Sequence, residues 1–189
     1  MFLILIRHSL PEINPAIPAR AWGLSQEGRR RCLGLVEALR PYQPECLYAS
    51  QEPKAQETAR LVAEYLQIPW ESRPNLHEHE RSGVPYTDHR TFEQQIAEFF
   101  RHPGKVVFGQ ESANQARKRF QAAMNQLPLD SAQNRFVVAH GTVISLYVSQ
   151  LCNINAFSFW QKLSLPACVV LDPQNARLVN LINDIGSRV

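Results

Sequence analysis

The stretch MFLILIR, residues 1–7, is a short apolar run without the spacing of an amphipathic helix. A strand that is apolar on both sides is typical of a sheet covered by helices on both faces. The run ends in Arg7, and His8 follows it directly, so a charged side chain and a titratable one stand where the strand ends. We therefore expect a central strand with polar side chains at its carboxyl end.

Strand-like and helix-like stretches alternate along the rest of the chain. Helices are predicted over 25–40, from Pro53 as far as Leu66, and over 91–100, 112–126 and 142–151. Strands are predicted over 46–49, 68–73, 135–139, 167–171 and 177–182. This alternation predicts an α/β fold, a three-layer α/β/α sandwich whose sheet is mainly parallel and has an antiparallel edge made by the last two strands.

Length and composition limit the possible classes of protein. A chain of 189 residues that is 44% hydrophobic and 20% charged is enough for one compact domain. We expect a single domain over 1–189, with the segment 75–109 as a small cap over the site. No apolar run approaches the roughly 20 residues of a membrane helix, so a membrane protein is excluded and secretion is not expected.

Cysteine usage and charge indicate compartment and partners. The four cysteines show no paired spacing, which is typical of reduced thiols in the cytoplasm. A formal charge of +3 is too small to indicate nucleic-acid binding, and the one basic run, 28–31, is typical of a solvated helix face. We expect no nucleic-acid and no membrane partner, and either a monomer or a homodimer.

Three predicted strand ends carry groups that suit an anion. Arg7 and His8 follow the first strand, Lys54 comes after the second, and His140 and Gly141 follow the strand 135–139. Ligands of parallel sheets bind outside the carboxyl ends of the strands, so these groups are expected to converge. Such a cluster suits a phosphoryl group, and an imidazole nitrogen can attack phosphorus in line. A lone histidine at a strand end more often has a structural role than a catalytic one. The prediction therefore rests on two histidines, His8 and His140, at separate strand ends.

A metal site is the other interpretation of the polar segment. The run 76–81 alternates histidine and carboxylate residues, and an extended chain would place His77 and His79 on one face. No third ligand is evident, and solvated loop charge is the simpler interpretation. No metal is therefore expected.

Six short motifs, in order, span nearly the whole chain. They are LILIRHS at 3–9, GLSQEG at 23–28, SQEPKAQETA at 50–59, LHE at 76–78, QES at 110–112 and VVAHG at 137–141. Together they resemble the histidine phosphatase superfamily, also called phosphoglycerate mutase-like, whose first motif is Arg-His-Gly at the end of an apolar strand. Each motif alone is weak, whereas the ordered set is specific.

The resemblance implies a metal-independent phosphomonoester hydrolase that acts on a small phosphorylated metabolite and has no cofactor. It implies that His8 takes the phosphoryl group as a phosphohistidine, while Arg7 and His140 bind the phosphate oxygens. It implies that Glu78 protonates the leaving oxygen and then activates water, a dual role that suits a carboxyl group whose pKa is raised by desolvation. The remaining phosphate contacts that we expect are Ser9, Asn14, Lys54 and Gly141.

Departures from the family pattern leave a second function open. Lys54 stands where the family has an arginine, and an ammonium does not reproduce the bidentate contacts of a guanidinium. Ser9 replaces the glycine of Arg-His-Gly, and Ser82 and Gly83 stand where Trp-Glu-Gly often follows the acid. Weaker phosphate binding is the expected cost. The alternative is a catalytically weak binding module for a phospho-ligand or phosphoprotein, whereas mutase activity is disfavoured by the short chain.

Overall fold

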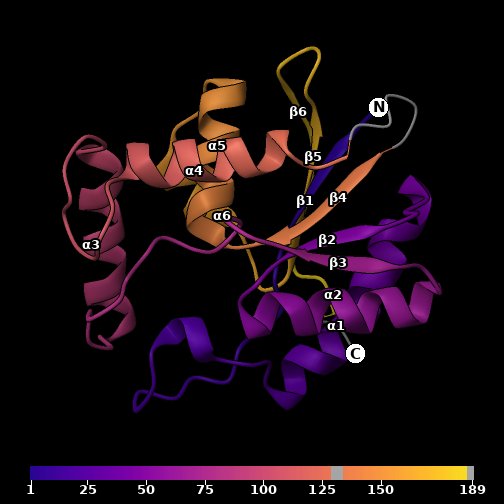
Figure 1. Cartoon of the computed structure of the whole chain (residues 1–189), viewed down its shortest axis with the longest axis horizontal. Helices are drawn as coiled ribbons and strands as arrows, with labels where there is room; N and C mark the ends of the chain where they lie inside the picture. Colours follow the sequence, from indigo (N-terminus) through magenta and orange to yellow (C-terminus); the bar gives the residue numbers. More distant parts are fainter. Residues whose placement is uncertain (129–133, 187–189) are drawn as a thin grey trace.

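The computed structural model describes residues 1–128 and 134–186. Within these ranges the strands are β1 (Leu3–Arg7), β2 (Leu47–Ser50), β3 (Trp70–Arg73), β4 (Arg135–Ala139), β5 (Ala167–Asp172) and β6 (Arg177–Ile182). The α-helices there are α1 (Gln26–Leu39), α2 (Pro53–Leu66), α3 (His89–Arg101), α4 (Ala113–Asn125), α5 (Gly141–Cys152) and α6 (Ala156–Lys162). Figure 1 shows their arrangement.

The strands of the described chain form one six-stranded mixed sheet. Their order is β3-β2-β4-β1-β5-β6. The pairs β2–β3, β2–β4 and β1–β4 are parallel, whereas β5 is antiparallel to both β1 and β6. The predicted α/β fold is therefore confirmed, with the antiparallel edge where the last two strands pair.

Helices cover both faces of this sheet. Along β1, Leu3 and Leu5 pack into one buried cluster while Ile4 and Ile6 pack into the other, because successive side chains of a strand point to opposite faces. Residues of α1 and α2 complete the second cluster, and residues of α4, α5 and α6 complete the first. Figure 1 shows α1 and α2 on one side of the sheet and α4 to α6 on the other. The central position predicted for the first strand follows from these two cores.

Most predicted elements lie within a few residues of the observed ones. The strand predicted over 46–49 is observed at Leu47–Ser50, and the strand predicted from 68 begins only at Trp70. The Ile68 amide still bonds to Ala63 O at the end of α2, and Pro69 has no N–H to donate to a ladder. Helix α6 was not predicted, because its seven residues are too few for a helical period to show.

In the part of the chain that is described, no helix has both the length and the apolar character needed to cross a membrane.

Candidate active site

The ends of β1 and β4 bring two histidines together. The two strands pair in parallel with Arg7 opposite Ala139, so the residues that follow them lie side by side. The ring centroids of His8 and His140 are 5.1 Å apart, and both side chains are buried. We call Arg7, His8, His140 and Gly141 the strand edge. Its geometry follows from the strand register, as the sequence predicted.

The His8 ring is held in one tautomer. Its Nδ1 lies 2.7 Å from Ser9 O, and because a carbonyl oxygen only accepts, Nδ1 carries the proton. Burial lowers the pKa of His8 well below its ordinary value, and the charges at His140 and Lys54 lower it further. The imidazole is therefore neutral near pH 7, with its lone pair on Nε2.

His140 is fixed from the neighbouring strand. Its Nε2 lies 2.8 Å from the Ser50 hydroxyl at the end of β2. Burial, followed by the positive charge of Lys54, lowers the pKa of His140 well below its ordinary value. Both imidazoles of the strand edge are therefore neutral at physiological pH.

Arg7 extends from β1 over the beginning of α5. Its Nη1 donates to Leu163 O at 2.5 Å. A Cβ at Gly141 would lie 3.0 Å from Arg7 Nε, so the guanidinium packs where only glycine leaves room. Burial lowers the pKa of Arg7 to about 10, with Glu78 opposing the shift, so the group stays charged at neutral pH.

Glu78 lies in the loop after β3, and its carboxylate caps the N-terminus of α5. It accepts hydrogen bonds from the amides of His79 at 2.9 Å, Thr142 at 3.1 Å and Val143 at 3.3 Å. Arg81 Nη2 lies 3.3 Å from its second oxygen.

The pKa of Glu78 differs in direction from the sequence expectation. Burial raises it, as expected, but the positive charge of Arg81, the electrostatic influence of the neighbouring His140 and the backbone N–H donors outweigh burial, so the pKa lies below its ordinary value. The expectation of a raised pKa was wrong, because the sequence did not show that a helix N-terminus and an arginine would face this carboxylate.

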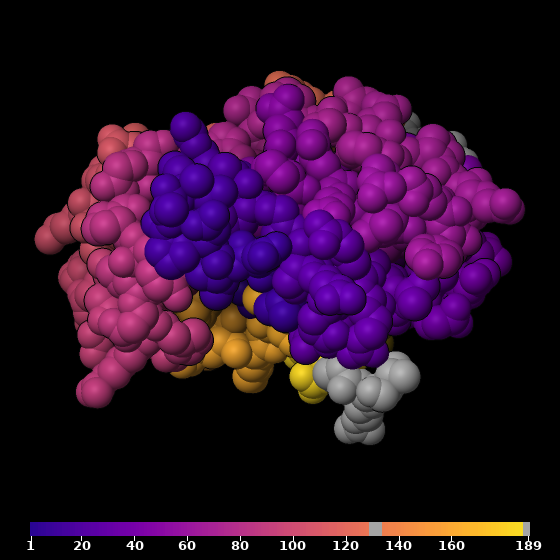
Figure 2. All heavy atoms as spheres, turned by 90° about the horizontal axis from the view of Figure 1, so that it is seen from below, coloured from indigo at the N-terminus to yellow at the C-terminus, as the bar shows by residue number. Residues whose placement is uncertain are grey.

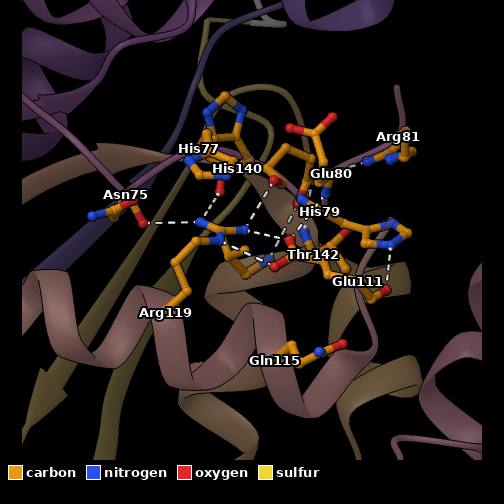
Figure 3. Close-up of polar contacts among 12 residues, drawn as sticks. Asn75, His77, His79, Glu80, Arg81, Glu111, Gln115, Arg119, His140 and Thr142 are labelled. Atoms are coloured by element: carbon orange, nitrogen blue, oxygen red, sulfur yellow. Dashed lines mark hydrogen bonds and ion pairs between the residues drawn. The ribbon is translucent and has the colours of Figure 1, made fainter. Parts of the chain in front are cut away.

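The Glu78 segment, residues 75–82, is tied to α4 through Arg119. The Arg119 guanidinium donates to the carbonyls of Asn75 at 2.9 Å, His77 at 3.0 Å and Glu78 at 3.1 Å. It also forms an ion pair of 2.6 Å with Glu111. Figure 3 shows the guanidinium beneath the segment, with its contacts to both sides. The half-buried Arg119 therefore helps to hold the loop that carries Glu78.

The two histidines of this segment do not form a metal site. The His79 ring packs against Phe99 and Phe108, at centroid distances of 4.2 and 4.7 Å, and its Nε2 bonds to Glu111 O. Within the described ranges, no group of three or more His, Cys, Asp or Glu side chains is arranged to hold a metal ion.

Lys54 lies in the first turn of α2 and is buried. Its Nζ donates to Ala19 O at 2.9 Å, and it forms an ion pair with Glu52. The Lys54 amide bonds to Trp22 O, so the loop before α1 is fastened over the start of α2. Figure 2 shows this N-terminal part of the chain, in indigo, on the face between the pink α3 region and the purple α2 region.

Ser9 and Asn14 make local contacts. The Ser9 hydroxyl donates to Gly28 O at 2.7 Å, and its amide donates to Thr58 Oγ1 at 3.0 Å. The hydroxyl hydrogen of Ser9 thus links the end of β1 to α1. Asn14 lies in an exposed loop, where its side-chain oxygen accepts from the Ala16 amide. Their roles as phosphate contacts stay predictions.

A family model described as the histidine phosphatase superfamily (branch 1) matches residues 3–183. The chain belongs to this superfamily. The resemblance carried by the six motifs is therefore confirmed as family membership. A comparison with curated proteins finds no match.

Solved structures similar to this member of the superfamily share its fold at low sequence identity. A mycobacterial glucosyl-3-phosphoglycerate phosphatase in complex with VO3 has a TM-score of 0.72 at 16% identity, with 90% of each chain covered. The alpha-ribazole phosphatase from Shigella flexneri has a TM-score of 0.68 at 22% identity, covering 97% of this chain and 96% of the other. Bacillus stearothermophilus YhfR has a TM-score of 0.69 at 19% identity, over 90% of this chain and 91% of the other. These similarities confirm the phosphoglycerate mutase-like fold.

Sequence reasoning missed the contacts of three residues that shape the candidate site. Ser50 stands in the motif at 50–59, but its hydrogen bond to His140 becomes visible only in the fold. Glu52 gave one signal, its position two residues before Lys54. Arg119 gave none, because its contact with Asn75 spans 44 residues of sequence and depends on tertiary structure.

Proposed function

We propose that the protein is a phosphomonoester hydrolase that acts through a phosphohistidine on His8, without a metal, on a small phosphorylated metabolite. The observation that carries the proposal is the neutral His8 imidazole, whose Nδ1 proton is held by Ser9 O so that Nε2 is the nucleophile. It lies beside a second imidazole and a charged guanidinium. That combination suits attack on a phosphorus atom whose oxygens are held by cationic and polar groups.

The reaction has two steps. In the first, His8 Nε2 attacks phosphorus, the P–O bond to the leaving group breaks, and the leaving oxygen takes a proton from the protonated form of Glu78. In the second, water attacks the phosphohistidine, the P–N bond breaks, inorganic phosphate leaves, and the proton of the water passes to Glu78. The lowered pKa of Glu78 favours its role as base in the second step. We expect the first step to be slower for poor leaving groups, because little Glu78 is protonated near pH 7.

Buried polar atoms with no partner support an anion site. Among the described residues these include Arg7 Nε, His140 Nδ1 and Thr142 Oγ1. Buried polar groups nearly always have hydrogen-bond partners, and a phosphate group supplies several acceptor oxygens. The fold shared with two phosphatases supports the same class of reaction.

Phosphate release from p-nitrophenyl phosphate and a panel of sugar, nucleotide and phosphoglycerate monoesters, measured with EDTA present, tests the proposal. We expect turnover in the wild type and a loss of at least about 1000-fold in His8→Ala, since the nucleophile is removed. His102→Ala, an exposed histidine after α3, is the matched control and should keep full activity. Hydrolysis that survives in His8→Ala would refute the assignment.

A phospho-ligand binding module is the second candidate, favoured by one observation. Lys54, at the position of the family's arginine, is already paired with Glu52. Retained phosphate binding without turnover of any ester in the panel would favour this function over hydrolysis.

A further inference from the structure

The surroundings of the two histidines include a carboxylate that the proposed reaction does not use. Glu52 precedes α2, and its side chain is 10% exposed. One oxygen pairs with Lys54 Nζ. The other accepts a hydrogen bond of 2.8 Å from the Glu78 amide and lies 3.7 Å from His140 Nε2. A negative charge is therefore built into the site where a phosphate anion would bind.

The imidazoles around Glu52 do not offset its charge. His8 and His140 are neutral near pH 7 because burial lowers their pKa values. His77, which approaches Glu52 from the Glu78 segment, also has its pKa lowered, first by burial and then by the charge of Arg119. The net charge of the candidate site therefore comes from its arginines, Lys54 and its carboxylates.

Two ion pairs leave one positive charge over. Glu52 neutralises Lys54, and Glu78 lies 3.3 Å from Arg81. Arg7 is charged and bonds to a neutral carbonyl. The charges of Lys54, Arg81, Arg7 and the two carboxylates thus sum to one positive charge, whereas without the Glu52 carboxylate they would sum to two.

We propose that Glu52 is a specificity-determining residue of this site, which holds Lys54 in an ion pair and shifts the preference of the site away from a doubly charged phosphate group and toward a singly charged one. The inference rests on the proposed function, since it concerns the same phosphate site. Coulomb energy scales with the charge of the ligand, so Glu52 disfavours a dianion about twice as strongly, in free energy, as a monoanion. The second pKa of a phosphate ester is about 6, so both forms are available to the protein near neutral pH.

Sulfate and methyl sulfate are suitable probes, because they carry two charges and one charge and neither titrates near pH 7. Their dissociation constants are measured by calorimetry at pH 7.0 for the wild type and Glu52→Gln. We expect Glu52→Gln to bind sulfate about tenfold more tightly and methyl sulfate about threefold more tightly, since the second factor is the square root of the first. Glu64→Gln, an exposed glutamate of α2 paired with Arg60, is the matched control and should change neither constant.

Lys54→Gln and the double variant complete the test. Lys54→Gln removes one positive charge and should weaken sulfate binding more than methyl sulfate binding. Glu52→Gln in the Lys54→Gln background should restore the wild-type ratio of the two affinities, and this comparison serves if Glu52→Gln alone does not fold. Weaker binding of both anions to Glu52→Gln would overturn the inference, because Glu52 would then only position Lys54. An equal gain for both anions would also overturn it, because a charge effect must differ between them.

The failure of the inference is distinguishable from failure of the proposed function. An unchanged affinity ratio, together with hydrolysis that His8→Ala abolishes, overturns the role of Glu52 alone. Absence of sulfate binding in every protein removes the anion site itself, and both proposals fall together.

Discussion

The strand edge and the Glu78 segment meet in one site but are positioned in different ways. His8 and His140 follow two adjacent parallel strands, so the backbone register places the two residues side by side, with their ring centroids 5.1 Å apart. Glu78 lies in a loop whose carbonyls are held by Arg119, 41 residues further along the chain. A candidate nucleophile is thus placed mainly by the sheet, whereas its candidate acid–base partner is placed by side-chain and helix-end contacts, among which Arg119 makes the most to the loop backbone. The two parts should therefore fail separately.

Arg119→Ala should produce the largest effect, and it should act on the Glu78 segment and not on the strand edge. It removes the donors of the Glu78 segment and leaves the Glu111 carboxylate, only 13% exposed, without its ion pair. We expect unfolding free energy to fall by about 3 kcal/mol, as for a broken buried pair. We also expect kcat to fall about 100-fold through misplacement of Glu78, with little change in KM because the strand edge still binds phosphate.

Urea denaturation and steady-state kinetics of Arg119→Ala test this separation, with Arg117→Ala as the control. Arg117 lies on the same helix and bonds only to exposed Gln121 among the described residues. A raised KM with unchanged kcat would mean that Arg119 serves the phosphate site rather than Glu78.

Lowering the pH should act on the buried histidines before it acts on Glu78. The native pKa values of His8 and His140 lie below the ordinary 6.5, so the unfolded state binds more protons and stability falls as the pH drops below about 6.5. Between pH 7.5 and 5.5 the two should together remove up to about 2.7 kcal/mol of stability, the limit for two histidines that stay neutral in the native state, with His77 and His79 adding to the slope. The pKa of Glu78 is lowered instead from 4.5, so its contribution is present above about pH 4.5 and is lost only below it.

Urea denaturation over pH 3–8 measures these two stages. His8→Ala should reduce the slope between pH 7.5 and 5.5, and Glu78→Gln should alter only the slope below about pH 4.5. A His8→Ala slope equal to that of the wild type would show that His8 is not held neutral by burial.

How far each part could be predicted from sequence follows from the same contrast. The apolar strands and the residues that end them are local features, so the sheet and the strand edge were predictable from 3–8 and 135–141. The position of Glu78 as a motif residue was predictable, but its pKa was not, because Thr142 and Val143 reach it only in the fold. Glu52 was missed because its position two residues before Lys54 does not by itself show that the two side chains form a buried ion pair.

Gly141→Ala should produce the smallest effect, and on the strand edge alone. The added Cβ would lie 3.0 Å from Arg7 Nε, so the guanidinium must shift by a few tenths of an ångström. We expect kcat/KM to fall about tenfold with a stability loss of about 1 kcal/mol, as for mild overpacking. Gly104→Ala is the control, since nothing lies within 4 Å of its added Cβ. Equal kinetics of the two variants would indicate that the placement of Arg7 does not matter for the reaction.

Trapping the phosphoenzyme tests the central claim most directly. Under the proposed mechanism Glu78→Gln should slow the attack of water on the phosphohistidine, so this variant should accumulate the intermediate when mixed with ³²P-labelled substrate and quenched in base. The account predicts acid-labile, base-stable label on the peptide that contains His8, and no label in His8→Ala. Label on another residue, or turnover without any labelled peptide in the wild type and Glu78→Gln, would contradict it.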